Sequence, residues 1–344
     1  MQRPRKLLTM ILVAGLLAAA CGSDDEGSTD PTTDGPDAGL VVYSGRNEDL
    51  VGPLIEMFEE ASGITVEVRY GDTAEMAAQI LEEGDNSPAD VFFGQDAGAL
   101  GALAMEGRLQ ELSETQLGLV GDGLKDDAGR WVGTSARARV AVYNNEELTE
   151  ADLPDSILDF VEPEWKGRIG WAPTNGSFQA FVTALRVIEG EDGARAWLEG
   201  IQANDPLVLD NNVATVEAVA AGEISVGFVN HYYLYQFLAE DPDYAASNKL
   251  FSGGDAGGLV NVAGAGVLDT ATNLDEANEL IDFLLSEEAQ TYFAEETYEI
   301  PVAHGVEPVE GVPTLDDVTL ATVDLNKLDD LAGTLALLTD LGIV

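Results

Sequence analysis

Basic residues, histidine and cysteine are all scarce in this chain of 344 residues. Only 16 lysines and arginines oppose 63 aspartates and glutamates, which gives a formal net charge of −47. A surface this acidic repels phosphate backbones, so we exclude a nucleic-acid-binding protein. The single cysteine excludes an intramolecular disulfide and a cysteine-built zinc site. Two histidines, His231 and His304, leave little material for histidine-based acid–base catalysis.

The sequence motifs of common enzyme classes are missing as well. There is no G-x-S-x-G, no P-loop, no G-x-G-x-x-G after a predicted strand and no H-E-x-x-H. We therefore expect a protein that is not an enzyme. Hydrophobic residues make up 45% of the chain, which is enough for sizeable cores and excludes global disorder. The length fits about two domains.

The first 39 residues have the features of an export signal followed by a tether. A basic stretch precedes a helix-prone apolar run, Leu7 to Ala20, which is shorter than the ~20 residues of a membrane span. Small residues before Cys21 resemble a bacterial lipobox, so we expect cleavage there and a lipid on the cysteine sulfur; an ordinary secretory signal is the alternative. The protein would be exported and anchored by this lipid alone at the outer face of the cell membrane or in the periplasm. We assign residues 1–20 to the signal peptide and 21–39 to a flexible linker.

From Leu40 onward, short apolar runs alternate with amphipathic helical patterns. A strand is predicted over 63–68, for example, and one long helix over 275–293. Such alternation indicates βαβ units with parallel strands, and we predict an α/β fold with two such units joined by extended crossings. Open α/β sheets bind ligands at the carboxyl ends of their strands. The residues just after each predicted strand are therefore the candidates for a binding cleft.

Two adjacent tyrosines, Tyr232 and Tyr233, follow a predicted strand and precede a predicted helix. Phenolate oxygens are hard anionic donors that suit Fe³⁺, whose charge lowers the pKa of a tyrosine from its usual ~10. Two aromatic residues that pack the start of a helix are the alternative interpretation. His231, next to them, is either a neighbour of the ligands or a polar turn residue.

Several polar residues after other predicted strands also have two interpretations. The segment from Thr174 to Ser177 opens a helix, where free N–H groups and hydroxyls form an anion site, or where Asn175 or Ser177 simply caps the helix. Asp96 either caps the helix predicted to begin at Ala97 or points a carboxylate into the cleft. Arg137 either holds an anion or pairs with a surface carboxylate.

Five segments, in the same order along the chain, carry a resemblance to a known family. They are Tyr43-Ser44-Gly45-Arg46-Asn47, Gly84 to Phe92, Arg137 to Tyr143, Trp165 to Gly170, and Asn230-His231-Tyr232-Tyr233. Together they resemble the periplasmic ferric-ion-binding proteins, which are solute receptors of ABC iron transporters. The similarity extends over about residues 40 to 340, so it is far more specific than any single motif.

The resemblance implies a type II periplasmic-binding-protein fold, in which each lobe has a mixed, mainly parallel sheet flanked by helices. One lobe would comprise residues 40–136 and 264–312, and the other 137–263 and 313–344. The lobes would close on the ligand by a hinge motion. The implied protein is a monomeric lipoprotein that captures ferric iron and delivers it to an ABC permease.

The family's adjacent tyrosines are iron ligands, which implies that role for Tyr232 and Tyr233. Phosphate or carbonate would bind with the ion as a synergistic anion. The residues that match the anion site are Thr174, Asn175, Gly176, Ser177 and Asn212. Another branch of the family has a third tyrosine ligand at the position of Phe178, so this chain fits the phosphate-type branch.

Two positions depart from that branch, because Asn47 replaces its histidine ligand and Gln95 its glutamate ligand. Asp96 is the nearest carboxylate, and Asp96 and Gln95 are our candidates to complete the metal site. The other expected cleft residues are Ser44, Arg46, Asn47, Arg137, Asn230 and His231. A receptor of the same class for thiamine, a polyamine or another small cation is the alternative, since acidic and aromatic side chains also suit organic cations.

Overall fold

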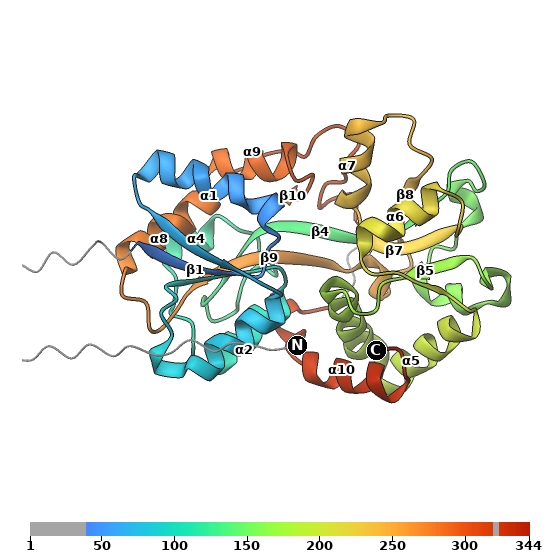
Figure 1. The fold of residues 1–344 in the computed structure, drawn as a ribbon, viewed down its shortest axis with the longest axis horizontal. Coiled ribbons are helices and arrows are strands. Elements are labelled where there is room, and N and C mark those ends of the chain that lie inside the picture. The colour runs from blue at the N-terminus through green and yellow to red at the C-terminus, as the bar shows by residue number, and fades with distance from the viewer. Residues whose placement is uncertain (1–38, 319–322) are drawn as a thin grey trace, which may run out of the picture. The chain divides into compact units, whose positions relative to one another are not determined.

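The computed structural model describes residues 39–318 and 323–344 (Figure 1). The predicted signal peptide, Cys21 and nearly all of the predicted linker lie outside the described residues. Among the described helices, none is both long enough and apolar enough to cross a membrane.

The first part of the chain alternates strands and helices, as its sequence pattern predicts. Asn47 caps the first helix through its side-chain oxygen, and Gly63 ends this helix in the left-handed conformation. Because Gly63 is used in this way, the second strand begins later than predicted, at Val66. The elements are β1 (Leu40–Ser44), α1 (Glu48–Ser62), β2 (Val66–Tyr70), α2 (Thr73–Glu83), β3 (Val91–Gly94), α3 (Ala97–Met105) and the short α4 (Glu114–Gly118).

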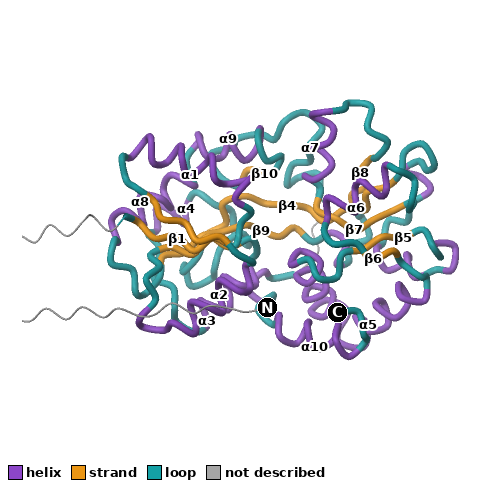
Figure 2. Tube along the Cα trace, viewed as in Figure 1, coloured by secondary structure: helices purple, strands orange, loops and turns teal. Residues whose placement is uncertain are grey.

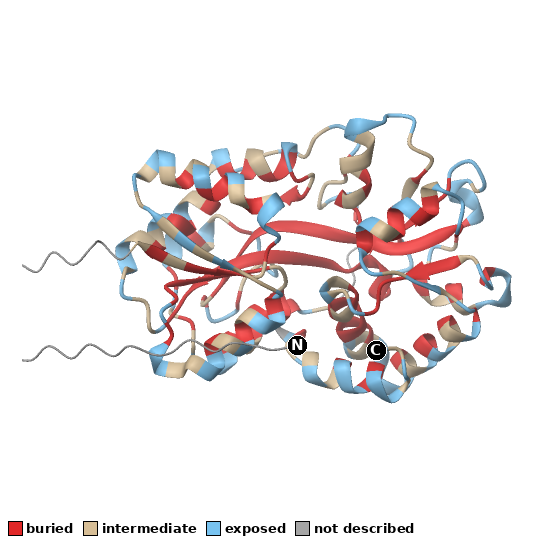
Figure 3. Cartoon of the chain, in the orientation of Figure 1, coloured by how far each residue is buried: buried red, intermediate tan, exposed pale blue. Residues whose placement is uncertain are grey.

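Two long antiparallel strands, β4 (Val132–Tyr143) and β9 (Val260–Val267), connect the two parts of the sheet. Residues 132–138 of β4 pair with β9, residues 139–143 pair with β7, and residues 140–143 also pair with β8 (Ser247–Leu250). Every residue of both long strands is buried, as Figure 3 shows. The resulting strand order is β2-β1-β3-β9-β4-β7-β5-β6, with β8 and β10 (Ile300–Pro301) also paired to β4.

The second part of the sheet repeats the parallel arrangement, with β5 between β6 and β7. Its strands and helices are β5 (Ile169–Trp171), α5 (Gly176–Ala203), β6 (Leu207–Val208), α6 (Asn212–Ala220), β7 (Val226–Asn230) and α7 (Tyr232–Glu240). Helices α3, α5, α6 and α7, which begin at or next to residues predicted to line the cleft, each start within a few residues of the end of a strand (Figure 2). The predicted α/β class with two parallel units and extended crossings is confirmed.

The single long helix predicted over 275–293 is wrong, because the structure has two helices there. They are α8 (Leu274–Leu284) and α9 (Glu287–Glu295). Ser286 interrupts the pattern, since its hydroxyl accepts a hydrogen bond of 3.2 Å from the Ala289 N–H and caps α9. Apolar periodicity continues across this break, which is why the sequence pattern alone does not reveal it.

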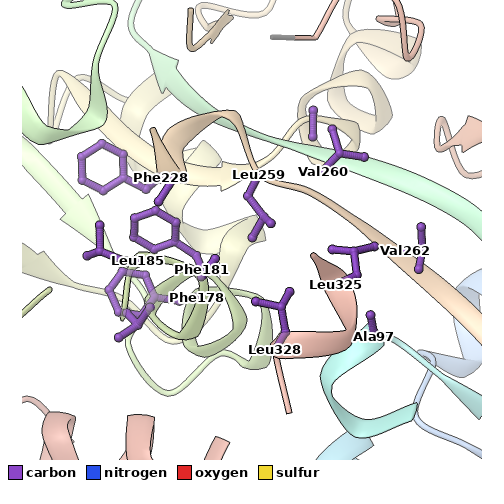
Figure 4. Packing of buried hydrophobic residues seen from close by; sticks show 14 of the residues in the cluster. Ala97, Phe178, Phe181, Leu185, Phe228, Leu259, Val260, Val262, Leu325 and Leu328 are labelled. Atoms are coloured by element: carbon purple, nitrogen blue, oxygen red, sulfur yellow. The ribbon is translucent and has the colours of Figure 1, made fainter. Parts of the chain in front are cut away.

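The C-terminal segment packs on helices from both parts of the chain. The last helix, α10 (Leu331–Asp340), packs on α5, with Thr183 and Thr334 hydroxyls 2.8 Å apart. Leu325 and Leu328, just before α10, belong to the same buried cluster as Ala97 at the start of α3 (Figure 4).

We expect Gly98→Ala to destabilise the protein by about 1–3 kcal/mol, because an added methyl group would overfill the contact between α3 and the backbone of Leu328. A Cβ at Gly98 would lie 2.4 Å from the carbonyl oxygen of Leu328. Gly101→Ala in the same helix is the matched control, since its nearest neighbour would be 3.8 Å away. Urea unfolding should show the control unchanged or slightly stabilised; an equal loss in both variants would contradict the prediction.

Candidate functional site

Tyr232 and Tyr233 begin helix α7, which is separated from β7 by His231 alone. Their ring centroids are 4.3 Å apart, and Tyr232 is only 1% exposed. Burial, followed by the nearby Tyr233 and Glu299, raises the pKa of Tyr232 well above its ordinary value of 10, while Arg137 opposes the rise. The strand-to-helix turn therefore brings two phenols together in a place where a cation is needed to ionise the buried one.

The predicted anion residues converge around the start of α5. Asn175 caps this helix, and its side-chain oxygen accepts from the N–H of Ser177 at 3.0 Å and from the Ser177 hydroxyl at 2.6 Å. Asn212, at the start of α6, donates to the same hydroxyl at 3.0 Å. The Oδ1 atom of Asn212 is buried and has no hydrogen-bond partner. Thr174 and Gly176 are exposed.

Two arginines of β4, Arg137 and Arg139, are each 2% exposed. Both terminal nitrogens of Arg137 lack a hydrogen-bond partner. Burial lowers the pKa of both guanidinium groups, to about 9 for Arg139, and Tyr233 is the largest influence that opposes this shift of the Arg139 pKa. Arg139 also donates to the Phe228 carbonyl at 2.8 Å. Burying hydrogen-bond donors without partners costs free energy, and an anionic group bound beside this arginine pair would offset that cost.

Asp96 and Gln95 lie between β3 and α3. The Asp96 carboxylate caps α3 by accepting from the Ala99 N–H at 3.1 Å. Desolvation raises the pKa of Asp96, and the positive charge of Arg137 lowers it. Asp96 and Arg137 thus influence each other electrostatically while Asp96 serves as a helix cap. Gln95 is half-buried, and its backbone N–H donates to the Thr73 hydroxyl at 3.1 Å.

The residues after β1 make hydrogen bonds within their own turn and one distant ion pair. Asn47 is exposed, and its side chain accepts from the Asp49 N–H at 2.9 Å as the cap of α1. The Ser44 hydroxyl accepts from the N–H of Arg46 at 3.1 Å. The Arg46 guanidinium forms an ion pair of 2.7 Å with Glu299, and both side chains are almost completely buried.

His231 is completely buried, and both ring nitrogens already have backbone partners. Nδ1 accepts from the Ala138 N–H at 3.1 Å, so the proton is on Nε2, which donates to the Tyr298 carbonyl at 2.9 Å. Burial lowers the pKa of this imidazole to about 4, so the ring is neutral. Neither nitrogen is free for a metal ion. Asn230, the preceding residue, has a buried side-chain NH₂ group without a partner.

Sequence reasoning missed Glu299, a buried carboxylate that influences Tyr232, Arg137 and His231 electrostatically. Its Oε2 atom is bound by Arg46 and by the Thr297 hydroxyl, whereas Oε1 is buried without a partner. The available signal was a single acidic residue directly before the apolar run Ile300-Pro301-Val302-Ala303.

Parallel β-α units on both sides of two crossing strands, with polar residues gathered at the strand ends, define a solute-binding protein of the type II periplasmic class. The chain belongs to the family of bacterial extracellular solute-binding proteins, which it matches over residues 86–331. The three expected cleft residues of the turn that follows β1, Ser44, Arg46 and Asn47, precede that matched range.

Individual relatives and a solved structure agree with this membership. The chain is 36% identical to the major ferric iron-binding protein of Neisseria meningitidis serogroup B (strain MC58) over 257 residues, which are 74% of this chain and 77% of the relative. It is 32% identical to the Fe(3+)-binding periplasmic protein of Serratia marcescens over 296 residues, 85% and 87% of the two chains. Crystalline iron-bound HitA from Pseudomonas aeruginosa matches with a TM-score of 0.84 and 33% identity, covering 88% of this chain and 99% of HitA. The resemblance seen in the sequence is thus confirmed.

Proposed function

We propose that this protein captures ferric iron outside the cytoplasm and delivers it to an ABC permease. The ion is cargo, and the phenolates of Tyr232 and Tyr233 are its principal protein ligands. The ferric proteins among the relatives support this cargo. The positive charge of the ion would offset the desolvation that keeps the Tyr232 phenol protonated in the free protein. Asp96 and Gln95 would approach the ion from the side of β3 and α3.

The observation that carries the proposal is the arginine pair beside the two phenols. Arg137 has two buried terminal nitrogens without partners, and Arg139 is buried next to it. The total positive charge of a trivalent ion and these two guanidinium groups exceeds the total negative charge of two phenolates and the Asp96 carboxylate. We therefore propose that iron binds with a multivalent oxyanion such as phosphate or carbonate, or as a small chelate, held by Asn175, Ser177, Asn212 and Arg137.

The same pair argues against the alternative cargo. Thiamine, a polyamine or another organic cation would meet two buried positive charges at the place where its own charge must lie. The acidic surface favours cations in general, but the lining of this site favours an anion beside the metal.

The remaining parts of the proposal concern export and closure. We propose that Cys21 carries the lipid anchor and that the protein acts as a monomer. The lobes would be residues 40–136 with 264–312 and residues 137–263 with 313–344, closing on the ligand by a hinge motion. The strand pairing supports this division, since β4 changes partners from β9 to β7 and β8 near Arg139.

A visible-absorption titration of residues 22–344 with ferric citrate tests the cargo directly. We expect a broad phenolate-to-iron charge-transfer band that saturates at one ion per chain. Adding phosphate should alter the band if Asn175, Ser177 and Asn212 hold an anion. A folded protein that develops no band with or without phosphate would contradict ferric binding, and thiamine and polyamines would then be titrated by calorimetry.

A further inference from the structure

The loop of Thr297, Tyr298 and Glu299, between α9 and β10, has an unusual backbone. Tyr298 has a φ of 57°, in the left-handed region that residues other than glycine rarely adopt. Such a conformation persists only where the surroundings hold it. Here the Tyr298 ring stacks on the Tyr235 ring of α7, with centroids 6.3 Å apart. The backbone carbonyl of Tyr298 accepts the hydrogen bond from His231.

His231 connects this loop to the start of the tyrosine-bearing helix. Its ring accepts from the backbone of Ala138 on β4 and donates to the backbone of Tyr298 on the loop. Its own carbonyl accepts from the Asn248 side chain of β8 at 2.8 Å. Three elements distant in sequence therefore fix the residue that immediately precedes Tyr232.

The same loop also reaches the turn after β1. Glu299, the residue after Tyr298, forms the buried ion pair with Arg46. One short loop thus holds both the β1–α1 turn and the beginning of α7. The loop contacts α7 itself through the Tyr298–Tyr235 stack, and it is hydrogen-bonded to the residue just before Tyr232 through the His231 side chain.

We propose that His231 is a positioning residue for ferric binding: its hydrogen bond to the Tyr298 carbonyl aligns the Tyr232 and Tyr233 phenols, and the imidazole does not touch the ion. This inference rests on the proposed function. Both ring nitrogens are occupied by backbone groups, so a direct ligand role is excluded. Residues that orient metal ligands from outside the coordination sphere typically change metal affinity by about 10–100-fold when they are replaced.

Two substitutions at the same position separate the two hydrogen bonds. The amide of His231→Gln reaches about as far as Nε2 and can still donate to the Tyr298 carbonyl. The amide of His231→Asn reaches only about as far as Nδ1, so it retains an acceptor for Ala138 and loses the bond to the loop. We expect ferric affinity near that of the wild type for the glutamine variant, and an affinity about 10–100-fold weaker with a shifted charge-transfer band for the asparagine variant.

His304→Asn is the matched control, because His304 is exposed, and it should bind as the wild type does. Melting of each apo-protein verifies that it is folded. Equal affinities of the glutamine and asparagine variants, whether both unchanged or both reduced, would overturn the proposal. Absence of the band in the wild type would instead overturn the proposed function.

If the asparagine variant fails to fold, substitutions of Tyr298 test the same link from its other end. Tyr298→Asn keeps a residue that tolerates positive φ, so the carbonyl should stay in place and binding should persist. Tyr298→Val disfavours that backbone conformation and should weaken ferric binding. A folded valine variant with the affinity of the wild type would contradict the positioning role.

Discussion

Replacing Tyr232 and Tyr233 together with phenylalanine is expected to abolish ferric binding and the charge-transfer band while preserving the fold. The substitutions remove only two hydroxyl groups from rings that remain packed 4.3 Å apart. Those oxygens are the principal protein ligands of the proposed site. For four-ligand zinc sites the binding free energy is about 10–16 kcal/mol, so losing two donors should cost at least about 5 kcal/mol, which is more than ~10³-fold in affinity.

Tyr235→Phe is the control for a tyrosine hydroxyl on the same helix. The Tyr235 hydroxyl donates to the carbonyl of Gly311 at 2.5 Å and is not one of the proposed ligands. This variant should keep the band and the ferric affinity of the wild type in the same titration. A double phenylalanine variant that still binds ferric ion tightly would show that the ligands lie elsewhere in the chain.

Glu299→Ala is expected to destabilise the apo-protein by about 3–5 kcal/mol, because it leaves the Arg46 charge buried without the carboxylate that neutralises it. The two side chains are 0% and 1% exposed and 2.7 Å apart. The guanidinium lies against the rings of Phe93 and Phe293, at 5.4 and 5.9 Å, and cannot reach water without disturbing them. Urea unfolding monitored by circular dichroism measures the loss.

Two further variants show whether the loss comes from the unpaired charge. Replacing Arg46 and Glu299 together with methionine removes both charges, and this variant should be much more stable than Glu299→Ala. Asp340→Ala breaks an exposed ion pair with Arg195, formed at the similar distance of 2.8 Å, and should cost less than ~1 kcal/mol. Similar losses in Glu299→Ala and Asp340→Ala would contradict the argument from burial.

Local sequence patterns predicted the elements that carry the site. The helices that begin at Glu48, Thr73 and Ala97 start where the patterns indicate, because polar caps and apolar periodicity are both local signals. The pairing of Asn175 with Ser177 also arises within one helix start. The break between α8 and α9 was missed because a serine cap inside an apolar pattern is a weak signal.

The sequence by itself determined the α/β class, the strand ends that gather at the site, the scarcity of catalytic groups and the adjacent tyrosines. Only the tertiary structure decided the contacts of His231 and Glu299. The imidazole bonds to a carbonyl 67 residues away, and the carboxylate pairs with a guanidinium 253 residues away. No local pattern encodes such contacts, because they depend on how the crossing strands bring distant loops together. The sequence shows which groups are present, and the fold decides which of them are buried, paired or left with unsatisfied hydrogen bonds.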